Sequence, residues 1–250
     1  MTADFFINTW RRVADFIWPR VCAVEDCACP SDRPDRHLCS ACFAALPFYD
    51  FPGTCRVCNS PVAAKTYHEF TCEECERHPP AFEFARSAVV YREPVDQLLL
   101  DFKFHNSVWL CEDLTDLLEG AVRSKLRFAE IDAVLPVPLH PKRERERGYN
   151  QSALLAESLA RRLNRRFDAR SLSRTRNTEH QARLSGKDRL KNLKDAFTVK
   201  DTRFVRGRTL LVIDDVMTTG ATLSHCARAL LQAGAARIWC ATVSRALLRQ

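Results

Sequence analysis

The sequence from residue 210 to residue 222 is LLVIDDVMTTGAT, an apolar run followed by two adjacent acids and a turn of small residues. Its first four residues predict a buried strand, and the apolar spacing after the turn predicts a helix over residues 222–233 that Gly234 ends. Open α/β sheets bind ligands at the carboxyl ends of their strands, and we expect Asp214 and Asp215 to lie there. The stretch therefore predicts a parallel α/β sheet with a ligand site at one edge.

The turn in this stretch has the chemistry of a phosphate site. Backbone N–H groups at the start of a helix, threonine hydroxyls and the helix dipole all favour an anion, and a glycine lets the backbone approach it closely. The two carboxylates can accept hydrogen bonds from vicinal ribose hydroxyls and lie near the place where Mg²⁺ would bridge a multiply charged ligand. An acidic loop whose threonines cap a helix is the simpler alternative. The hydroxyl donors expected around the phosphate are those of Thr218, Thr219 and Thr222, and Gly220 is the glycine that lets the backbone come close.

A second segment, residues 135–151, reads LPVPLHPKRERERGYNQ and also leads from a predicted strand into a helix. Its loop is basic, so Lys142, Arg143 and Arg147 are candidate contacts for a pyrophosphate through charge-assisted hydrogen bonds. In the alternative interpretation, the two glutamates between these arginines pair with them in a helical surface network.

The net charge of +7 conceals a local excess of positive charge. Residues 141–208 carry 20 basic and 8 acidic side chains, a balance of +12, whereas residues 1–140 carry 14 and 21, a balance of −7. Such an excess attracts phosphate, whether in a small polyanion or in a nucleic-acid backbone. Charge alone leaves a solvated basic face equally open.

The rest of the chain from residue 86 onward has the pattern of an ordinary α/β domain. Residues 171–195 are polar and basic, and they predict a loop with a short helix near residues 187–195. Apolar spacing predicts further strands at residues 87–91, 133–137 and 238–243, and helices at residues 95–104, 110–126 and 151–166.

Nine of the twelve cysteines lie between Cys22 and Cys75, in a segment without long apolar periodicity. Three Cys-x-x-Cys pairs occur there, a spacing that suits tetrahedral zinc. A fourth pair, which comes first in the chain, is irregular, because Cys22 is followed by both Cys27 and Cys29, and we favour Cys27 as the ligand. The simplest grouping places Cys22, Cys27, Cys39 and Cys42 on one structural zinc ion and Cys55, Cys58, Cys72 and Cys75 on another.

Other arrangements of this module stay open. The ligands can interleave, only one ion can be bound, or a histidine among the cysteines (His37, His68 or His78) can replace the irregular ligand. Disulfides are the alternative to metal, which we disfavour because nothing in the sequence suggests secretion. Cys111, Cys226 and Cys240 lie on apolar stretches and are expected to be buried core thiols.

The N-terminal residues 1–21 are rich in Phe, Ile and Trp, but charged residues interrupt them before any signal-peptide core can form. They predict an amphipathic helix that docks on its own protein, with attachment to a lipid surface as the alternative. No apolar run approaches the length of a membrane span, so we expect a cytoplasmic protein without one.

Residues 210–222 resemble the motif with which type I phosphoribosyltransferases bind phosphoribosyl pyrophosphate (PRPP): four apolar residues, two acids, then a threonine and glycine turn. The resemblance implies that Asp214 and Asp215 are catalytic-site residues holding the ribose hydroxyls and that the basic loop holds the pyrophosphate. It also implies that the 5′-phosphate is held by Met217, Thr218, Thr219, Gly220, Ala221 and Thr222. It implies displacement of pyrophosphate from C1 of the ribose, driven by positioning and charge, with Mg²⁺ accompanying PRPP. Residues 174–189 look like the segment that closes over such a site.

The order of motifs over nearly the whole chain is similar to that of the ComF/GntX family: cysteine knuckles, the basic segment with RGYNQ, RTRNT at residues 174–178, then the acid pair. The resemblance implies a double zinc ribbon at residues 22–80 joined to a type I phosphoribosyltransferase-like domain at residues 86–250. Such bacterial proteins are associated with natural competence and DNA uptake, or with gluconate utilisation in the GntX branch. The irregular first knuckle is the main departure from the pattern.

Three functions follow from these features. We favour an enzyme that uses PRPP, because a pure binding module has no physical need for the acid pair and the phosphate turn. In the second hypothesis, the chain is a DNA-uptake factor that binds single-stranded DNA and a competence ATPase or helicase, with Tyr149 and Phe197 as candidates for base stacking. The third is a metabolic phosphoribosyltransferase. We disfavour it because the sequence has no recognisable hood, the part of such enzymes that would indicate a purine or pyrimidine substrate.

Overall fold

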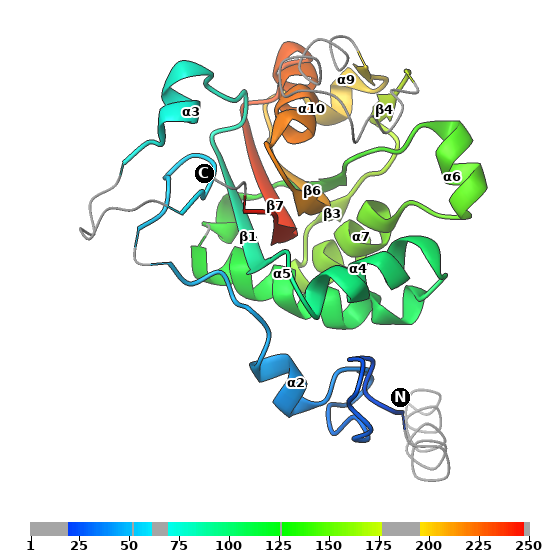
Figure 1. The fold of residues 1–250 in the computed structure, drawn as a ribbon. Helices are drawn as coiled ribbons and strands as arrows, with labels where there is room; N and C mark the ends of the chain where they lie inside the picture. The colour runs from blue at the N-terminus through cyan, green and yellow to red at the C-terminus, as the bar shows by residue number, and fades with distance from the viewer. Residues whose placement is uncertain (1–19, 52, 62–69, 126, 177–195, 248–250) are drawn as a thin grey trace.

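The fold is described from a computed structural model, which places residues 20–51, 53–61, 70–125, 127–176 and 196–247. Its centre is a five-stranded, fully parallel sheet with the strand order β1-β7-β6-β2-β3 (Figure 1). The predicted α/β class is therefore confirmed. The strands are β1 (Phe84–Val90), β2 (Ala133–Pro136), β3 (Arg166–Phe167), β6 (Thr209–Met217) and β7 (Arg237–Arg245).

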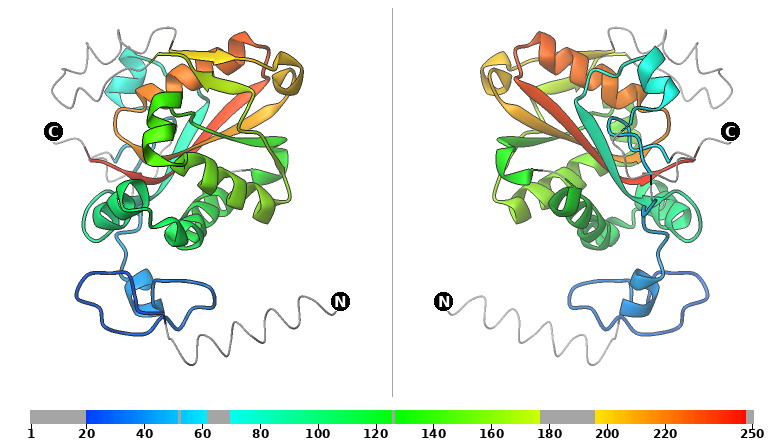
Figure 2. Two further views of the ribbon diagram at one scale, coloured as in Figure 1. Left: turned by 90° about the vertical axis from the view of Figure 1, so that its right-hand side faces the viewer. Right: turned by 90° about the vertical axis from the view of Figure 1, so that its left-hand side faces the viewer.

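Helices cover both faces of the sheet (Figures 1 and 2). Alternate residues of β6 serve the two cores, because successive side chains of a strand point to opposite faces: Leu211 and Ile213 face one, and Leu210 and Val212 face the other. Helices α4 (Val95–Phe104), α5 (Cys111–Lys125) and α7 (Gln151–Leu163) pack on the first face, and α10 (Ala221–Gln232) with α9 (Thr202–Val205) packs on the second. Among the described helices, none has the length and apolarity needed to cross a membrane.

Several elements differ from the sequence-based expectations. Strand β6 continues to Met217 because β7 pairs with it as far as Arg245, so Asp214 and Asp215 lie inside the strand rather than after it. Helix α7 ends at Leu163, where Asn164 adopts φ +53°, and this frees the next residues to form β3. The basic loop after β2 is a helix, α6 (Pro141–Arg147).

The segment expected to be a loop at residues 171–195 begins with a strand. Strand β4 (Leu172–Arg174) pairs antiparallel with β5 (Phe197–Val199). The short helix expected near residues 187–195 and most of the expected closing segment lie outside the described residues. The same holds for residues 1–19 of the expected N-terminal helix.

The cysteine-rich region forms two lobes on opposite sides of the sheet, the first against helix α5 and the second beside β1 and the end of β7 (Figures 1 and 2). The first lobe (residues 20–45) contains α2 (Ser40–Ala44) and the second lobe (residues 53–61 and 70–80) contains α3 (Glu73–Arg77). Between them, residues 46–51 run antiparallel to β1, with Phe48 bridged to Val89. This connection covers the backbone of an edge strand that would otherwise be open to another chain.

Candidate functional site

The site lies where the neighbouring strands β2 and β6 end. Their register pairs Pro136 with Ile213, and the N–H of Val137 donates to the Ile213 carbonyl at 2.8 Å. From these two strands the sheet is built outward in opposite directions, to β3 on one side and β7 on the other. Crevices at such divergence points are where open α/β sheets bind ligands. Helix α6 follows β2 and the turn of residues 218–220 follows β6, so both predicted binding segments leave the carboxyl ends of neighbouring strands.

The acid pair is held by two residues that the sequence analysis did not assign to the site. Lys103, at the end of α4, places its Nζ 3.0 Å from Oδ2 of Asp215, which is only 4% exposed. The Ser152 hydroxyl, in the first turn of α7, donates to Oδ1 of Asp214 at 2.8 Å. Lys103 is the one cation of its predicted helix, and that isolated charge could have marked it as a site residue. Nothing in the sequence marks Ser152, because only the tertiary fold brings it to Asp214.

Burial and the neighbouring charge of Asp215 raise the pKa of Asp214 to about 7, against the opposing effects of the Ser152 hydrogen bond and of Lys103. A ligand that donates hydrogen bonds to this carboxylate, as ribose hydroxyls do, favours its ionised form. The site thus holds a carboxylate whose charge the neighbouring protein groups compensate only in part.

The sequence RGYNQS between α6 and α7 explains how the two helices are placed. Gly148 ends α6 with φ +86°, which a glycine adopts without strain. The Tyr149 hydroxyl donates to a backbone carbonyl at the end of α4. Asn150 caps α7 by accepting from the N–H groups of Ser152 and Ala153 at 3.0 and 3.4 Å, and its own amide donates to the carbonyl of Val137 at 3.1 Å. These contacts hold Ser152 against Asp214.

The basic residues of α6 differ in their surroundings. Arg143 and Arg147 are four residues apart on one face and half-buried, whereas Lys142 is exposed. Arg147 donates to the side chain of Gln151, and its guanidinium lies 4.9 Å from the ring centroid of Phe104. Among the residues that the structure describes, no ion pair joins the glutamates of α6 to these arginines. The surface-network alternative therefore has no support here.

Arg174, on β4, is a further cation near the acid pair. Burial lowers its pKa; the positive charge of Arg143 adds to this effect, whereas Asp214 opposes it. Burial likewise lowers the pKa of Arg147, and the negative charge of Asp215 is the largest effect that opposes this shift. Cations from β4 and α6 thus share one electrostatic environment with the carboxylates of β6. An anion bound between them would relieve their mutual repulsion.

The turn after β6 is shaped by Gly220. Its φ is +79°, and a Cβ at this position would lie 2.6 Å from Cε of Met217. Thr218 and Thr219 are exposed, and Thr219 Oγ1 accepts from the N–H of Ala221 at 3.3 Å. Met217 is 2% exposed, so its side chain supports the turn from inside and only its backbone faces the site.

Both candidate residues for base stacking are poorly placed for it. Phe197 is 7% exposed, with the guanidinium of Arg174 5.5 Å from its ring centroid. Tyr149 is half-buried and tied to α4 by its hydroxyl. The prediction that these rings are available to stack on bases is wrong for Phe197, because the β4–β5 pair buries that ring in the core.

Each cysteine lobe brings four sulfur atoms together, in the two groups favoured from the sequence. Within each group the Sγ atoms all lie within 4.8 Å of one another, including a Cys27–Cys39 distance of 3.9 Å and a Cys58–Cys72 distance of 3.6 Å. A tetrahedral site with metal–sulfur bonds of 2.3 Å separates its sulfurs by about 3.8 Å. The tetrads therefore fit a divalent metal. Cys29 is exposed and belongs to neither group.

The two lobes are built alike. The N–H of Cys22 donates to the carbonyl of Cys29 at 2.9 Å in the first, and the N–H of Cys55 donates to the carbonyl of Ser60 at 2.8 Å in the second. The third cysteine of each tetrad then begins a short helix, α2 or α3. Neither His37 nor His78 joins a tetrad: the ring of His37 packs 4.6 Å from that of Trp109, and His78 is exposed.

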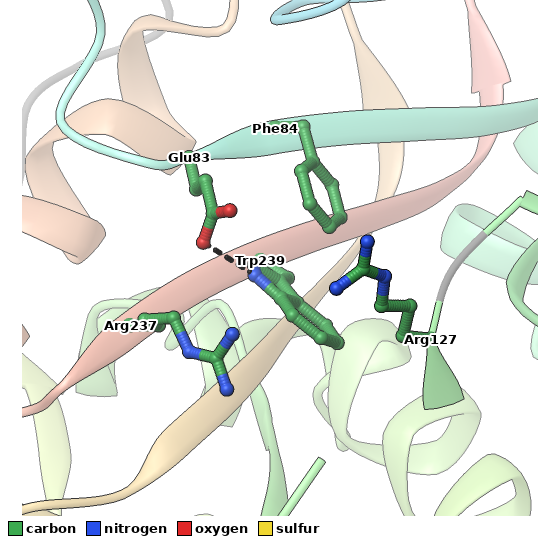
Figure 3. A pocket seen from close by; sticks show the side chains of 5 residues that line it. All are labelled: Glu83, Phe84, Arg127, Arg237 and Trp239. Carbon is green, nitrogen blue, oxygen red and sulfur yellow. Dashed lines mark hydrogen bonds between the residues drawn. The ribbon is translucent and has the colours of Figure 1, made fainter. Parts of the chain in front are cut away.

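A cavity of about 220 Å³ lies at the opposite edge of the sheet (Figure 3). It is lined by Glu83, Phe84, Arg127, Arg237 and Trp239, at the amino ends of β1 and β7. Its polar groups serve the fold: the indole N–H of Trp239 donates to Glu83 at 2.8 Å, and Arg237 pairs with Glu130 at 2.8 Å.

Comparisons with known proteins agree with this architecture. The phosphoribosyl transferase domain family matches residues 150–247. The chain is 34% identical to DNA utilization protein YhgH of Escherichia coli O6:H1, over 81% of this chain and 88% of that protein. It is 35% identical to competence protein F of Haemophilus influenzae, over 80% and 87%, and 29% identical to competence protein ComFC of Bacillus subtilis, over 82% of both.

The sheet, the site and the matched domain define a protein of the phosphoribosyltransferase-domain class. Within that class, the relatives that align with most of its length show that the chain belongs to the ComF family, as the order of its motifs predicted.

Proposed function

We propose that the chain binds PRPP at the carboxyl edge of β2 and β6 and acts in DNA uptake or utilisation, as the names of its relatives indicate for them. The observation that carries the PRPP proposal is the meeting of three binding segments at adjacent strands: the acid pair, the half-buried arginines of α6 and the glycine turn before α10. These segments offer, in order, acceptors for ribose hydroxyls, partners for a pyrophosphate and donors for a 5′-phosphate.

In this arrangement each part of the ligand meets a matching part of the protein. Asp214 and Asp215 accept from the 2′- and 3′-hydroxyls, while the N–H groups and hydroxyls of residues 217–222 surround the 5′-phosphate. Arg143 and Arg147, with Arg174 nearby, hold the pyrophosphate, and Lys142 at the rim adds attraction. Mg²⁺ that accompanies PRPP would neutralise part of its charge beside the carboxylates.

Transfer follows from this placement of charge. The bond between C1 of the ribose and pyrophosphate breaks as an acceptor approaches, the electron pair leaves with pyrophosphate and positive charge develops on the sugar. The guanidinium groups stabilise the leaving anion, and the carboxylates fix the ribose. We therefore propose a phosphoribosyltransferase whose acceptor belongs to the DNA-related role of the family.

Two structural zinc ions complete the proposal, one in each cysteine tetrad. All eight ligands are sulfur, which leaves no open position for catalysis and indicates a structural role.

The direct test is calorimetric titration of the zinc-loaded protein with PRPP, with and without Mg²⁺. We expect saturable binding that Mg²⁺ strengthens and that the double variant Asp214→Asn with Asp215→Asn loses by at least about tenfold, because hydrogen bonds to charged groups contribute about 1.5–3 kcal/mol each. Glu157→Ala, which removes an exposed acid of α7, is the matched control and should bind as the wild type does. Undiminished binding by the folded double variant would reject the ribose assignment.

A second candidate function is binding of single-stranded DNA and of a translocating ATPase, favoured by the +12 balance of residues 141–208. Titration of a labelled oligonucleotide at several salt concentrations tests it. An affinity that falls steeply with salt and survives the double aspartate variant would support DNA binding through phosphate contacts. If the folded protein binds the oligonucleotide and not PRPP, this second function replaces the first.

A further inference from the structure

Arg245, the last residue of β7, links the second cysteine tetrad to the strand that carries the acid pair. Its side chain is buried, with 4% of the residue exposed. One guanidinium nitrogen donates to the carbonyl of Cys58 and lies 3.2 Å from the sulfur of Met217. The other donates to the Ser60 hydroxyl at 2.6 Å and lies 3.8 Å from the Cys58 sulfur.

The buried charge of Arg245 has a natural partner in a metal-loaded tetrad. Within the part of the chain that the structure describes, no carboxylate forms an ion pair with this guanidinium. Four thiolates around one divalent cation carry a net charge of −2, whereas four protonated thiols carry none. Because a buried cation is costly without a compensating charge, the metal-loaded tetrad is the state that holds Arg245 in place.

Met217 lies between Arg245 and the phosphate turn and contacts both. Its Cε occupies the space that a side chain at Gly220 would need, so the methionine packs directly beneath the glycine. Its carbonyl accepts from the N–H of Ala246 at 3.0 Å, which ties the same residue to the end of β7. A shift of Arg245 therefore removes both a contact of the Met217 sulfur and the anchor of the neighbouring backbone.

The second lobe also reaches the turn by a separate route. Just after the lobe, the N–H of Ala81 donates to the hydroxyl of Ser224 in the first turn of α10, at 3.0 Å. The next residue, Phe82, is 3% exposed, and its ring would lie 3.6 Å from a Cβ at Gly220. The second lobe thus supports the turn both through Arg245 and through the chain that leaves α3.

The first lobe docks elsewhere and provides an internal comparison. Arg33 pairs with Asp113 at 2.9 Å and Arg36 pairs with Asp116 at 2.7 Å, both on α5. These contacts lie on the face of the sheet opposite α10. Metal loss from the first lobe should therefore leave the phosphate turn unchanged.

We propose that the metal in the second tetrad controls the shape of the phosphate turn, and that Arg245 is the positioning residue that couples the two. With the metal bound, the Cys58 carbonyl, the Ser60 hydroxyl and the thiolates fix the planar guanidinium, which holds Met217 under Gly220. Without it, Arg245 loses its counter-charge, and the turn loses its support. Withdrawal of zinc or oxidation of these thiols would then weaken the binding of a phosphate at the turn, which for PRPP rests on the function proposed above.

The first experiment needs no ligand. Cys72→Ser disrupts the second tetrad, Cys27→Ser disrupts the first, and elemental analysis verifies that each variant has lost one zinc ion. Hydrogen exchange of the amides of residues 217–223 is then compared between them. We expect exchange at least about tenfold faster in Cys72→Ser and unchanged in Cys27→Ser, since exchange reports local opening. Equal exchange in the two variants would overturn the coupling.

The second experiment keeps both metals. Arg245→Met removes the hydrogen bonds and the charge, and Arg245→Lys retains the charge. We expect Arg245→Met to bind PRPP at least about tenfold more weakly and pyrophosphate, which the α6 end holds, as tightly as the wild type does, with part of the PRPP affinity restored by lysine. An equal loss for PRPP and pyrophosphate would mean a general structural defect and would overturn the positioning role.

The two experiments separate this inference from the proposed function. If the wild type binds no PRPP, the proposed function fails, while the exchange rates of the turn still decide whether the second tetrad controls it. If the wild type binds PRPP and Arg245→Met binds it equally well with unchanged exchange, the inference fails and the proposed function stands.

Discussion

Asp214 is a carboxylate in a place that disfavours its charge, which has a measurable effect on stability. Its pKa of about 7 in the folded protein is above the value of about 3.9 in an unfolded chain. The folded state therefore binds the proton more tightly, so the stability that this proton contributes is present at low pH and is lost as the pH rises from about 4 through 7.

The expected outcome is that Asp214→Asn stabilises the protein at pH 8. The variant should gain about 1 kcal/mol or more over the wild type, or roughly 2–4 °C in Tm, and the difference should shrink toward zero at pH 4. Urea denaturation of both proteins across this range measures it. A variant that is less stable than the wild type at pH 8 would contradict the assigned cause. The same variant should bind PRPP poorly, which would show that the site keeps this charge for function.

Gly220 allows a second comparison of single residues. Gly220→Ala forces a side chain into a left-handed backbone and into the methyl group of Met217, so a loss of about 1–3 kcal/mol of unfolding free energy is expected, with weaker PRPP binding. Gly120→Ala, in the middle of α5 with nothing within 4 Å of the added carbon, should stabilise by up to about 1 kcal/mol. Thermal unfolding of the two variants measures the difference in stability. Equal changes in Tm for Gly220→Ala and Gly120→Ala would contradict the steric argument.

Helix α6 is the element whose function is most open to test. Arg143 lies on its half-buried face, whereas Arg145 is exposed, so Arg143→Gln and Arg145→Gln remove equal charge from different faces. We expect about a 10- to 100-fold loss of pyrophosphate affinity for Arg143→Gln and a much smaller loss for Arg145→Gln, because one charge-assisted hydrogen bond contributes about 1.5–3 kcal/mol. Calorimetry with pyrophosphate measures both, and equal losses would indicate only a diffuse electrostatic attraction.

The elements of the sheet were predictable because their signals are local. Apolar runs marked β2 and β6, and the leucine stripe marked α7, so the α/β class followed from the sequence. The length of β6 did not, since its last four residues are held in the strand by pairing with β7 rather than by their own propensity. Strand β4 was missed for a similar reason: its partner β5 begins 23 residues after β4 ends.

The same distinction applies to the candidate site. The acid pair, the glycine turn and the basic segment are contiguous motifs and were visible in the sequence. Lys103 and Ser152 lie on two other helices and contact the acid pair only through the tertiary fold, and the charge of Arg174 on β4 interacts with that of Asp214. The grouping of the cysteines into two tetrads was the simplest interpretation of their order in the sequence, and the structure brings the same sulfurs together.

At the scale of the whole molecule, the metal content is the decisive quantity. Protein purified with reductant and without added metal should contain two zinc ions per chain by elemental analysis. Removal of both by a chelator should lower the Tm markedly, because each lobe is too small to be held by an apolar core of its own. A folded protein without stoichiometric zinc would show that the thiols are held together by packing alone.

The position of the two lobes in the chain also has a consequence for synthesis. Both leave the ribosome before the surfaces on which they dock, because the first lobe needs α5 and the second needs α10 and the end of β7. Domains begin to fold as they emerge, so during this interval each lobe has only its own four thiols to organise it. The proposed zinc ions would therefore have to bind early, so that each lobe is assembled before the helices and strands on which it docks are complete.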